Sequence, residues 1–176
     1  MLTEEELYAQ CIALLFAGHE TTRNLIGNGI YTLLKHPQET AELREKPEMI
    51  RTAVEEILRY ESPVQFTARV LKEDVEICGQ HLRKGWSVLC RLGAANRDPK
   101  RFKGPNQLDL KRLNNQHVAF GAGPHACIGG QLARLEGQVA LLNLVQRFPE
   151  MKLTGPRPEW APTFGLRGLK SLSVIM

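Results

Sequence analysis

The first 35 residues contain the pattern that most constrains this fold, a helical periodicity with no proline inside it. Thr3 and Glu6 have the spacing of a capping box, and Pro37 ends the segment. The pattern predicts one helix over about 4–35, which at about 1.5 Å per residue would be about 45 Å long. A domain of 176 residues is narrower than that, so we expect something larger to surround the helix. Its apolar or small positions at helical spacing are Leu7, Cys11, Leu14, Leu15, Gly18, Leu25, Ile26, Ile30 and Leu33.

The elements after this helix are short, and they predict a mainly α chain with small antiparallel β-sheets. Proline in the first turn favours two helices, over 37–45 and 47–60. β-Forming residues gather in three segments that predict a small antiparallel sheet, at 66–70, 75–78 and 86–90. The remaining predictions are an irregular loop over 96–116, a glycine-rich loop over 121–130, a helix over 128–147 and short C-terminal strands, the last around 171–175.

Composition and charge exclude several classes of protein. Hydrophobic residues make up 43% and charged residues 24%, which excludes a disordered or collagen-like chain. The net charge of +4 is spread without a dense basic run, so we expect no nucleic-acid partner. The longest uncharged stretch, residues 7–18, is too short and too polar to span a bilayer, and we expect no membrane association. The acidic start lacks the pattern of a signal peptide, which predicts a cytoplasmic protein.

The four cysteines have irregular spacing. They include no Cys-x-x-Cys pair, so the sequence predicts neither a zinc ribbon nor a redox dithiol. Reduced thiols are favoured because no secretory signal is seen. We expect Cys11, Cys78 and Cys90 to be small buried apolar residues, and Cys127 to be different.

Cys127 lies in the glycine-rich loop. A dinucleotide fingerprint is excluded there because Pro124 lies inside the motif and Gln146 occupies the position of the required acid. Glycines at 121, 123 and 129 would let the backbone approach a large flat ligand and hold a cysteine on a strained loop. A thiolate at a helix start is stabilised by the helix dipole, and such cysteinates ligate haem iron for O–O bond cleavage. The alternative is a buried cysteine in a glycine turn.

Four segments together resemble the cytochrome P450 monooxygenase family. Residues 120–129 match its haem-binding signature, Phe-Gly-x-Gly-x-His-x-Cys-x-Gly, at every fixed position. Residues 17–22 resemble its oxygen-activation motif, 56–59 its Glu-x-x-Arg helix motif, and 102–112 the segment that supplies a third partner, Arg112. The four occur in the family's order, and details such as His117 resemble the soluble bacterial branch.

The resemblance implies a cofactor and the residues that hold it. The cofactor would be haem b (iron protoporphyrin IX), with the Cys127 thiolate as axial metal ligand. Arg69 and His125 would hold the propionates. The other cofactor-binding residues of the signature are Phe120, Gly121 and Gly129.

Two further motifs have alternatives that the sequence leaves open. The Thr21 hydroxyl could bond a backbone carbonyl and open the helix, and the resemblance implies that Thr21 and Glu20 handle protons during oxygen activation. The alternative is a polar patch on an amphipathic helix. A zinc-protease motif at His19 is excluded because Arg23 stands where a second histidine is required.

Glu56 and Arg59 are three residues apart on one predicted helix face, close enough to pair. A solvated surface ion pair is the simple interpretation. The resemblance implies instead a buried pair joined by Arg112, which would lock the region that holds the cysteine loop.

The resemblance covers the whole chain, but only as the C-terminal part of the cytochrome P450 fold. We expect 1–176 to be a partial domain without the family's preceding segments, which supply the lid and most of the substrate pocket. Its parts would be an oxygen-binding helix over 1–35, helices over 36–60, a small sheet over 61–95, the loops over 96–130, and a helix and strands over 131–176.

Three functions follow as hypotheses. The first is a haem-thiolate monooxygenase that inserts one atom of O2 into a small hydrophobic substrate. Its electrons would come from NAD(P)H through ferredoxin reductase and ferredoxin or an equivalent, and Arg91 or Arg134 could help dock the acidic ferredoxin. The second is a haem-binding module without monooxygenase activity. The third is an inactive fragment that exposes an apolar helix face. Segments 64–66 and 163–166 could line what remains of the pocket, or could simply pack in the core or turns.

Overall fold

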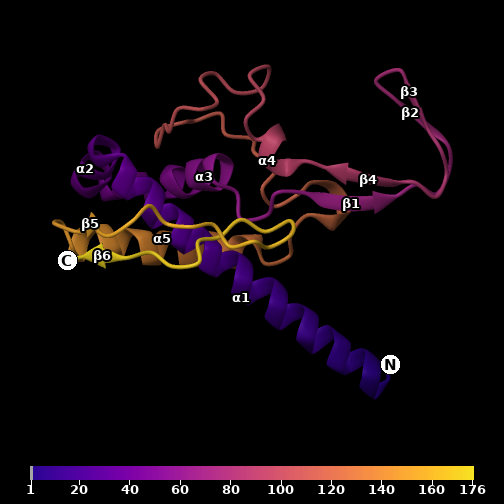
Figure 1. The fold of residues 1–176 in the computed structure, drawn as a ribbon, viewed down its shortest axis with the longest axis horizontal. Helices are drawn as coiled ribbons and strands as arrows, with labels where there is room; N and C mark the ends of the chain where they lie inside the picture. Colours follow the sequence, from indigo (N-terminus) through magenta and orange to yellow (C-terminus); the bar gives the residue numbers. More distant parts are fainter. Residues whose placement is uncertain (1) are drawn as a thin grey trace.

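The long first helix is confirmed. In the computed structural model, which describes residues 2–176, it is α1 and spans Glu4–Lys35 (Figure 1). The predicted capping box is present: the Glu6 N–H donates to the Thr3 hydroxyl oxygen at 3.2 Å, and the Thr3 N–H donates to the Glu6 carboxylate at 2.8 Å. Acidic residues in the first turn and Lys35 in the last complement the helix dipole. Local signals therefore set both ends of α1.

The C-terminal half of α1 lies in the core with three other helices. These are α2 (Pro37–Glu45), α3 (Ile50–Tyr60) and α5 (Gly130–Arg147), which gather around it in Figure 1. The crossing of α1 with α5 is close: a Cβ added at Gly29 would lie 2.9 Å from Leu141, and one at Gly137 would lie 3.2 Å from Leu25. Glycine at both positions lets the helices approach closely. The fully buried apolar side chains of this core include Leu33, Leu43, Val54, Ile57 and Leu141.

Small antiparallel sheets accompany the helices, as predicted, but in a different arrangement. β1 (Thr67–Val70) pairs with β4 (Ser87–Cys90), so that Thr67 lies opposite Cys90. β2 (Val75–Ile77) pairs with β3 (Gln80–Leu82), and β5 (Lys152–Leu153) with β6 (Val174–Ile175). Each described sheet has only two strands.

Several boundaries differ from the predictions. The helix predicted over 47–60 begins as a 3₁₀ turn, η1 (Pro47–Met49), ahead of α3, and 3₁₀ turns are frequent at the starts of α-helices. The helix predicted from 128 begins at Gly130. β3 and the short helix α4 (Leu92–Ala95) lay outside the predictions because both are too short to show a periodicity. Beyond α4, residues 96–116 form the irregular loop that was predicted.

The prediction that three cysteines are buried is wrong. Cys11, Cys78 and Cys90 are exposed, as is Cys127, and all four thiols are free. Cys11 lies on the uncovered half of α1, and Cys90 lies in a two-stranded sheet, which buries only the faces that another element covers. Cys78 sits in the turn between β2 and β3, where its φ of 51° is a left-handed value.

The N-terminal half of α1 is not covered by the rest of the described chain. It extends away from the other helices in Figure 1, and every residue from 2 to 19 is exposed. The molecule exposes 11900 Å² in total, whereas a compact monomer of this mass exposes about 8600 Å². No helix among residues 2–176 is long and apolar enough to cross a membrane. The large apolar side chains exposed on this half are Leu7, Tyr8, Ile12, Leu14, Leu15 and Phe16.

We predict that this apolar surface drives self-association of the 176-residue chain. The double substitution Leu15→Gln and Phe16→Gln should weaken association at least about tenfold, because each such side chain contributes roughly 1.5–3 kcal/mol when buried. Sedimentation velocity over a range of concentrations measures the change. Gln10→Ala, on the same exposed half, is the control and should leave association unchanged; equal association of the double variant and the wild type would contradict the prediction.

Candidate functional site

The cysteine loop, residues 120–130, is closed by its own backbone. Gly121 and Gly123 have φ values of 71° and 73°, in the left-handed region that favours glycine. The Cys127 N–H donates to the Phe120 carbonyl at 2.9 Å, and the Ala126 N–H donates to the Gly123 carbonyl at 3.0 Å, within the 3₁₀ turn η2 (Gly123–His125). The predicted need for glycine is confirmed at these two positions.

Cys127 presents an exposed thiol just before α5. Its carbonyl accepts the Gly130 N–H at 3.2 Å, so the thiol lies immediately ahead of the first helical turn. The alternative of a buried cysteine in a glycine turn is therefore wrong. The neighbouring Ile128 is 96% exposed, and a Cβ at Gly129 would meet nothing within 4 Å. The surface around the thiol is open and partly apolar.

The two residues predicted to hold the haem propionates are exposed, and their side chains are available to bind a ligand. Arg69 lies on β1, and the only described hydrogen bond of its side chain goes from Nη1 to the Ala68 carbonyl at 2.8 Å. His125 is exposed in η2. Neither side chain forms an ion pair with another residue of 2–176. Both can donate to an anionic ligand, and their role stays a prediction.

The Thr21 hydroxyl bonds backward within α1, as predicted. Its Oγ1 donates to the Ala17 carbonyl at 2.7 Å. The expected opening of the helix is wrong, because α1 is α-helical without interruption from residue 4 to residue 35. The hydroxyl bond occupies an acceptor lone pair of Ala17 and leaves the helical ladder intact. Glu20 forms an ion pair with Arg23 on the same helix, and its catalytic role stays a prediction.

Glu56 and Arg59 form a buried pair, so the surface interpretation is wrong. Both side chains have zero exposure, and Arg59 donates twice to the Glu56 carboxylate, each time at 2.8 Å. Arg112 joins them as expected, with its Nε 3.0 Å from Glu56 Oε2. Glu56 also accepts from the Asp109 N–H and from Asn115 Nδ2.

Arg59 uses its remaining donors on the irregular loop. It donates to the carbonyls of Asn96 at 2.9 Å, Pro105 at 2.8 Å and Gln107 at 3.2 Å. A buried charge is tolerated only when it is paired and its hydrogen bonds are satisfied, and this condition is met on both sides of the pair.

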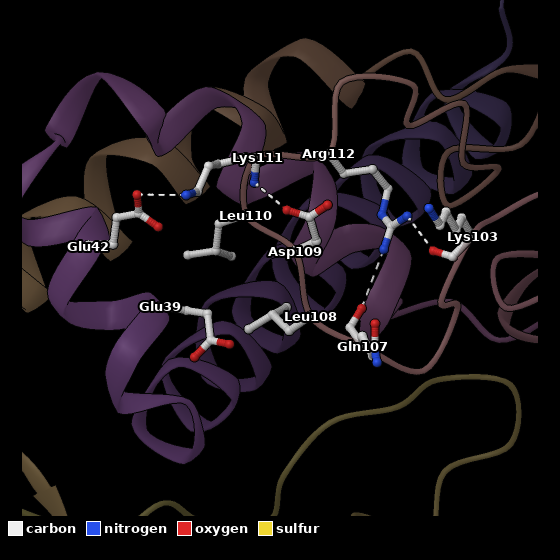
Figure 2. A pocket seen from close by; sticks show the side chains of 9 residues that line it. All are labelled: Glu39, Glu42, Lys103, Gln107, Leu108, Asp109, Leu110, Lys111 and Arg112. Atoms are coloured by element: carbon white, nitrogen blue, oxygen red, sulfur yellow. Dashed lines mark hydrogen bonds and ion pairs between the residues drawn. The ribbon is translucent and has the colours of Figure 1, made fainter.

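A polar pocket lies between α2 and this loop (Figure 2). Arg112 reaches the carbonyls of Lys103 and Gln107 there, and Lys111 pairs with Glu42 at 2.8 Å. Its lining contains neither Cys127 nor any predicted haem ligand. The pocket therefore belongs to the support of the loop and not to the cysteine site.

Sequence reasoning missed Glu55, which precedes the Glu-x-x-Arg motif. Its carboxylate accepts from Arg134 Nε at 2.7 Å and from His117 Nε2 at 3.0 Å. Burial raises the pKa of Glu55, but the hydrogen bonds from His117 and Arg134 and the charge of Arg134 outweigh it and lower the pKa to about 2. The hypothesis that Arg134 helps dock a ferredoxin is not favoured, because its guanidinium already donates to Glu55. The available signal in the sequence was a second glutamate, Glu55, directly before the glutamate of the Glu-x-x-Arg motif.

The two segments expected to line a pocket lie side by side. Val64 forms an antiparallel bridge with Leu166, and the Gln65 N–H donates to the Gly165 carbonyl at 2.8 Å. The rings of Phe66 and Phe164 meet with centroids 4.8 Å apart, and Phe164 remains 88% exposed. An apolar side chain is thus displayed at this junction.

Comparison with known proteins identifies the family of this chain. The family model described as Cytochrome P450 matches residues 1–165. The chain belongs to the cytochrome P450 family. Its fold is a portion of the P450 fold, and the resemblance drawn from the four motifs is confirmed.

The relatives are bacterial. The chain is 52% identical over 173 residues to the "Biotin biosynthesis cytochrome P450" of Bacillus subtilis, covering 98% of this chain and 44% of that protein. It is 45% identical to the "Polyketide biosynthesis cytochrome P450 PksS" of the same organism, covering 99% and 44%. The structure of P450BioI in complex with an acyl carrier protein ligated to hexadec-9Z-enoic acid superimposes with a TM-score of 0.96 at 51% identity, covering 99% of this chain and 45% of that one. The chain thus spans less than half the length of these relatives.

We predict that removing the buried carboxylate of Glu56 severely destabilises the fold. Glu56→Ala leaves Arg59 buried and unpaired, which should lower the free energy of unfolding by about 3–5 kcal/mol. Urea unfolding followed by circular dichroism measures this loss. Glu42→Ala, which breaks the exposed pairs with Lys46 and Lys111, is the control and should have little effect. Similar losses for both variants would contradict the argument.

We also predict a pH dependence for the stability contributed by Glu55. Its folded pKa lies below the ordinary 4.5, so its contribution is present above that value and is lost as the pH falls toward 2. Glu55→Gln should therefore be less stable than wild type by roughly 1–3 kcal/mol near about pH 7, with the difference shrinking near about pH 3. Urea unfolding of both proteins across this range is the measurement. A difference that stays constant with pH would overturn the assignment.

Proposed function

We propose that this chain is the haem-binding portion of a haem-thiolate monooxygenase. The observation that carries the proposal is the exposed Cys127 thiol on a glycine loop directly before α5, in a chain of the cytochrome P450 family. A cysteine in this position can bind a haem iron through its sulfur.

The donor set fits haem. Residues 2–176 contain no cluster of three or more His, Cys, Asp or Glu side chains that could hold a metal ion by themselves. A single cysteine suffices for haem b, because the porphyrin supplies four nitrogen ligands and the protein needs to add only an axial one. Arg69 and His125 would hold the propionates, and Phe120, Gly121 and Gly129 would form the loop beside the ring. When bound, this cofactor supplies the redox chemistry that splits O2, with one atom going to the substrate and the other to water.

Thr21 and Glu20 would move protons at the oxygen side. The Thr21 hydroxyl oxygen, whose hydrogen is given to Ala17, still has lone pairs that can accept a hydrogen bond. Glu20 would carry protons from water once its carboxylate leaves Arg23. Both residues lie at the point where α1 passes from its exposed half into the core.

The substrate would be a small hydrophobic molecule. The P450BioI structure is a complex with an acyl carrier protein ligated to hexadec-9Z-enoic acid, which has a long apolar chain, and Phe164 is exposed beside Phe66; both support an apolar ligand. Electrons would come from NAD(P)H through a ferredoxin reductase and a ferredoxin or an equivalent pair.

A haem-binding module or inactive portion without monooxygenase activity is the second candidate. The chain spans 44% of the length of the biotin biosynthesis cytochrome P450, and half of α1 has no covering element in the described chain. A substrate pocket needs walls that exclude water, and the described residues supply only part of one.

Substitution of Cys127, the proposed axial ligand, tests the proposal. The chain is expressed with haem available, reduced and exposed to carbon monoxide, and its spectrum is recorded. We expect a red-shifted Soret band typical of thiolate ligation, which Cys127→Ser abolishes. Cys90→Ser, which alters another exposed thiol, is the control and should keep the band.

The outcomes separate the candidates. If the wild type takes up no haem, both haem functions are wrong for this chain. If the band is present, a ferredoxin, its reductase and NAD(P)H are added with a fatty acid as probe. An oxygenated product supports a monooxygenase, and its absence supports the haem-binding module.

A further inference from the structure

The carboxylate of Glu55 connects α3 to both flanks of the cysteine loop. Its Oε1 accepts from Arg134 Nε at 2.7 Å, while its Oε2 accepts from Arg134 Nη2 at 3.1 Å and from His117 Nε2 at 3.0 Å. His117 precedes the loop in the sequence, and Arg134 follows it in the second turn of α5. One side chain therefore fixes the two ends of the segment that contains Cys127.

His117 transmits this restraint to the backbone before Phe120. Its side chain is 2% exposed, and its Nδ1 accepts the Ala119 N–H at 3.2 Å. Because Nδ1 accepts, the ring hydrogen lies on Nε2 and is donated to Glu55. The adjacent Val118 N–H donates to the Asn96 side chain at 2.8 Å, so a second side chain also holds the segment that enters the loop.

Arg134 transmits the restraint from the other end. Its guanidinium carbon lies 4.4 Å from the centroid of the Phe120 ring, a cation–π contact. Gly130 and the His117 ring also lie beside it: a Cβ added at Gly130 would lie 3.5 Å from Phe120, and the His117 and Phe120 ring centroids are 6.1 Å apart. The Phe120 carbonyl in turn accepts the Cys127 N–H at 2.9 Å. A continuous set of contacts thus leads from Glu55 to the backbone of Cys127.

We propose that Glu55 is a positioning residue for the cysteine loop, and that it holds the Cys127 backbone through His117, Arg134 and Phe120. The contacts described above by themselves restrain the loop. The consequence of this restraint for thiolate ligation rests on the proposed function.

Glu55→Gln tests the proposal with almost no change of shape. Glutamine replaces one carboxylate oxygen by an NH2 group, which would face the N–H donors of Arg134 or His117 and cannot accept from them. Hydrogen–deuterium exchange of the chain should then show the amides of residues 117–127 exchanging about tenfold faster. Peptides from β1 and β4 should exchange as in the wild type, because no described contact joins them to Glu55.

Two further variants make the test specific. Glu136→Gln removes an exposed carboxylate of α5 that has no ion-pair partner in residues 2–176, and it should exchange as wild type. Arg134→Lys keeps the charge beside Glu55 but lacks the planar fork and the stacked guanidinium, so it should give an intermediate increase. It also serves as the test if Glu55→Gln does not fold.

The carbon monoxide spectrum adds a readout that general destabilisation would not change in the same way. In haem-loaded protein that remains folded, we expect Glu55→Gln to shift part of the thiolate-type Soret band to the position typical of a protonated or displaced thiol. Arg134→Lys should shift less, and Glu136→Gln not at all.

The outcomes are distinct from those of the proposed function. If the wild type lacks the thiolate band, the proposed function fails, while the exchange of residues 117–127 still decides whether Glu55 positions the loop. If the wild type has the band and Glu55→Gln leaves both exchange and spectrum unchanged, the positioning role is overturned.

Discussion

The buried pair of Glu56 and Arg59 is the interaction on which the rest of this structure depends. Residues 96–116 form no helix or strand, so their backbone groups lack a hydrogen-bonding ladder of their own. Arg59 donates to three carbonyls of this segment, and Glu56 accepts from the Asp109 N–H and from the side chains of Arg112 and Asn115. Two charges that would be costly to bury alone become the framework around which an irregular segment is ordered.

Two adjacent glutamates of helix α3 support the site. Glu56 is directed to the irregular loop, and Glu55 to His117 and Arg134 beside the cysteine loop. Consecutive residues on a helix point about 100° apart, so neighbouring side chains reach different parts of the molecule. The close crossing of α1 with α5, permitted by Gly29 and Gly137, places α3 against both. The cysteine loop is therefore held by the helical core although its own residues are mostly exposed.

Burial is distributed unevenly along α1. From Thr22 onward the helix packs in the core, whereas residues 2–19 expose large apolar side chains. Apolar surface on this scale has a favourable free energy of burial when another element covers it. The chain spans less than half of its relatives, and the same helix carries Thr21 and Glu20 at the transition between its two halves. The residues proposed for oxygen chemistry therefore lie where the described core ends.

The sequence by itself determined what depends on neighbours in the chain. The bounds of α1, the left-handed glycines at 121 and 123, and the four family motifs follow from caps, prolines and residue types within a few positions of each other. Tertiary structure decided burial and partners. The exposure of Cys11, Cys78 and Cys90 and the partners of Glu55 depend on how distant segments pack, and Glu55 and Arg134 are 79 positions apart. Local residue spacing does not determine such contacts, because which surface covers a side chain is settled only when distant segments pack together.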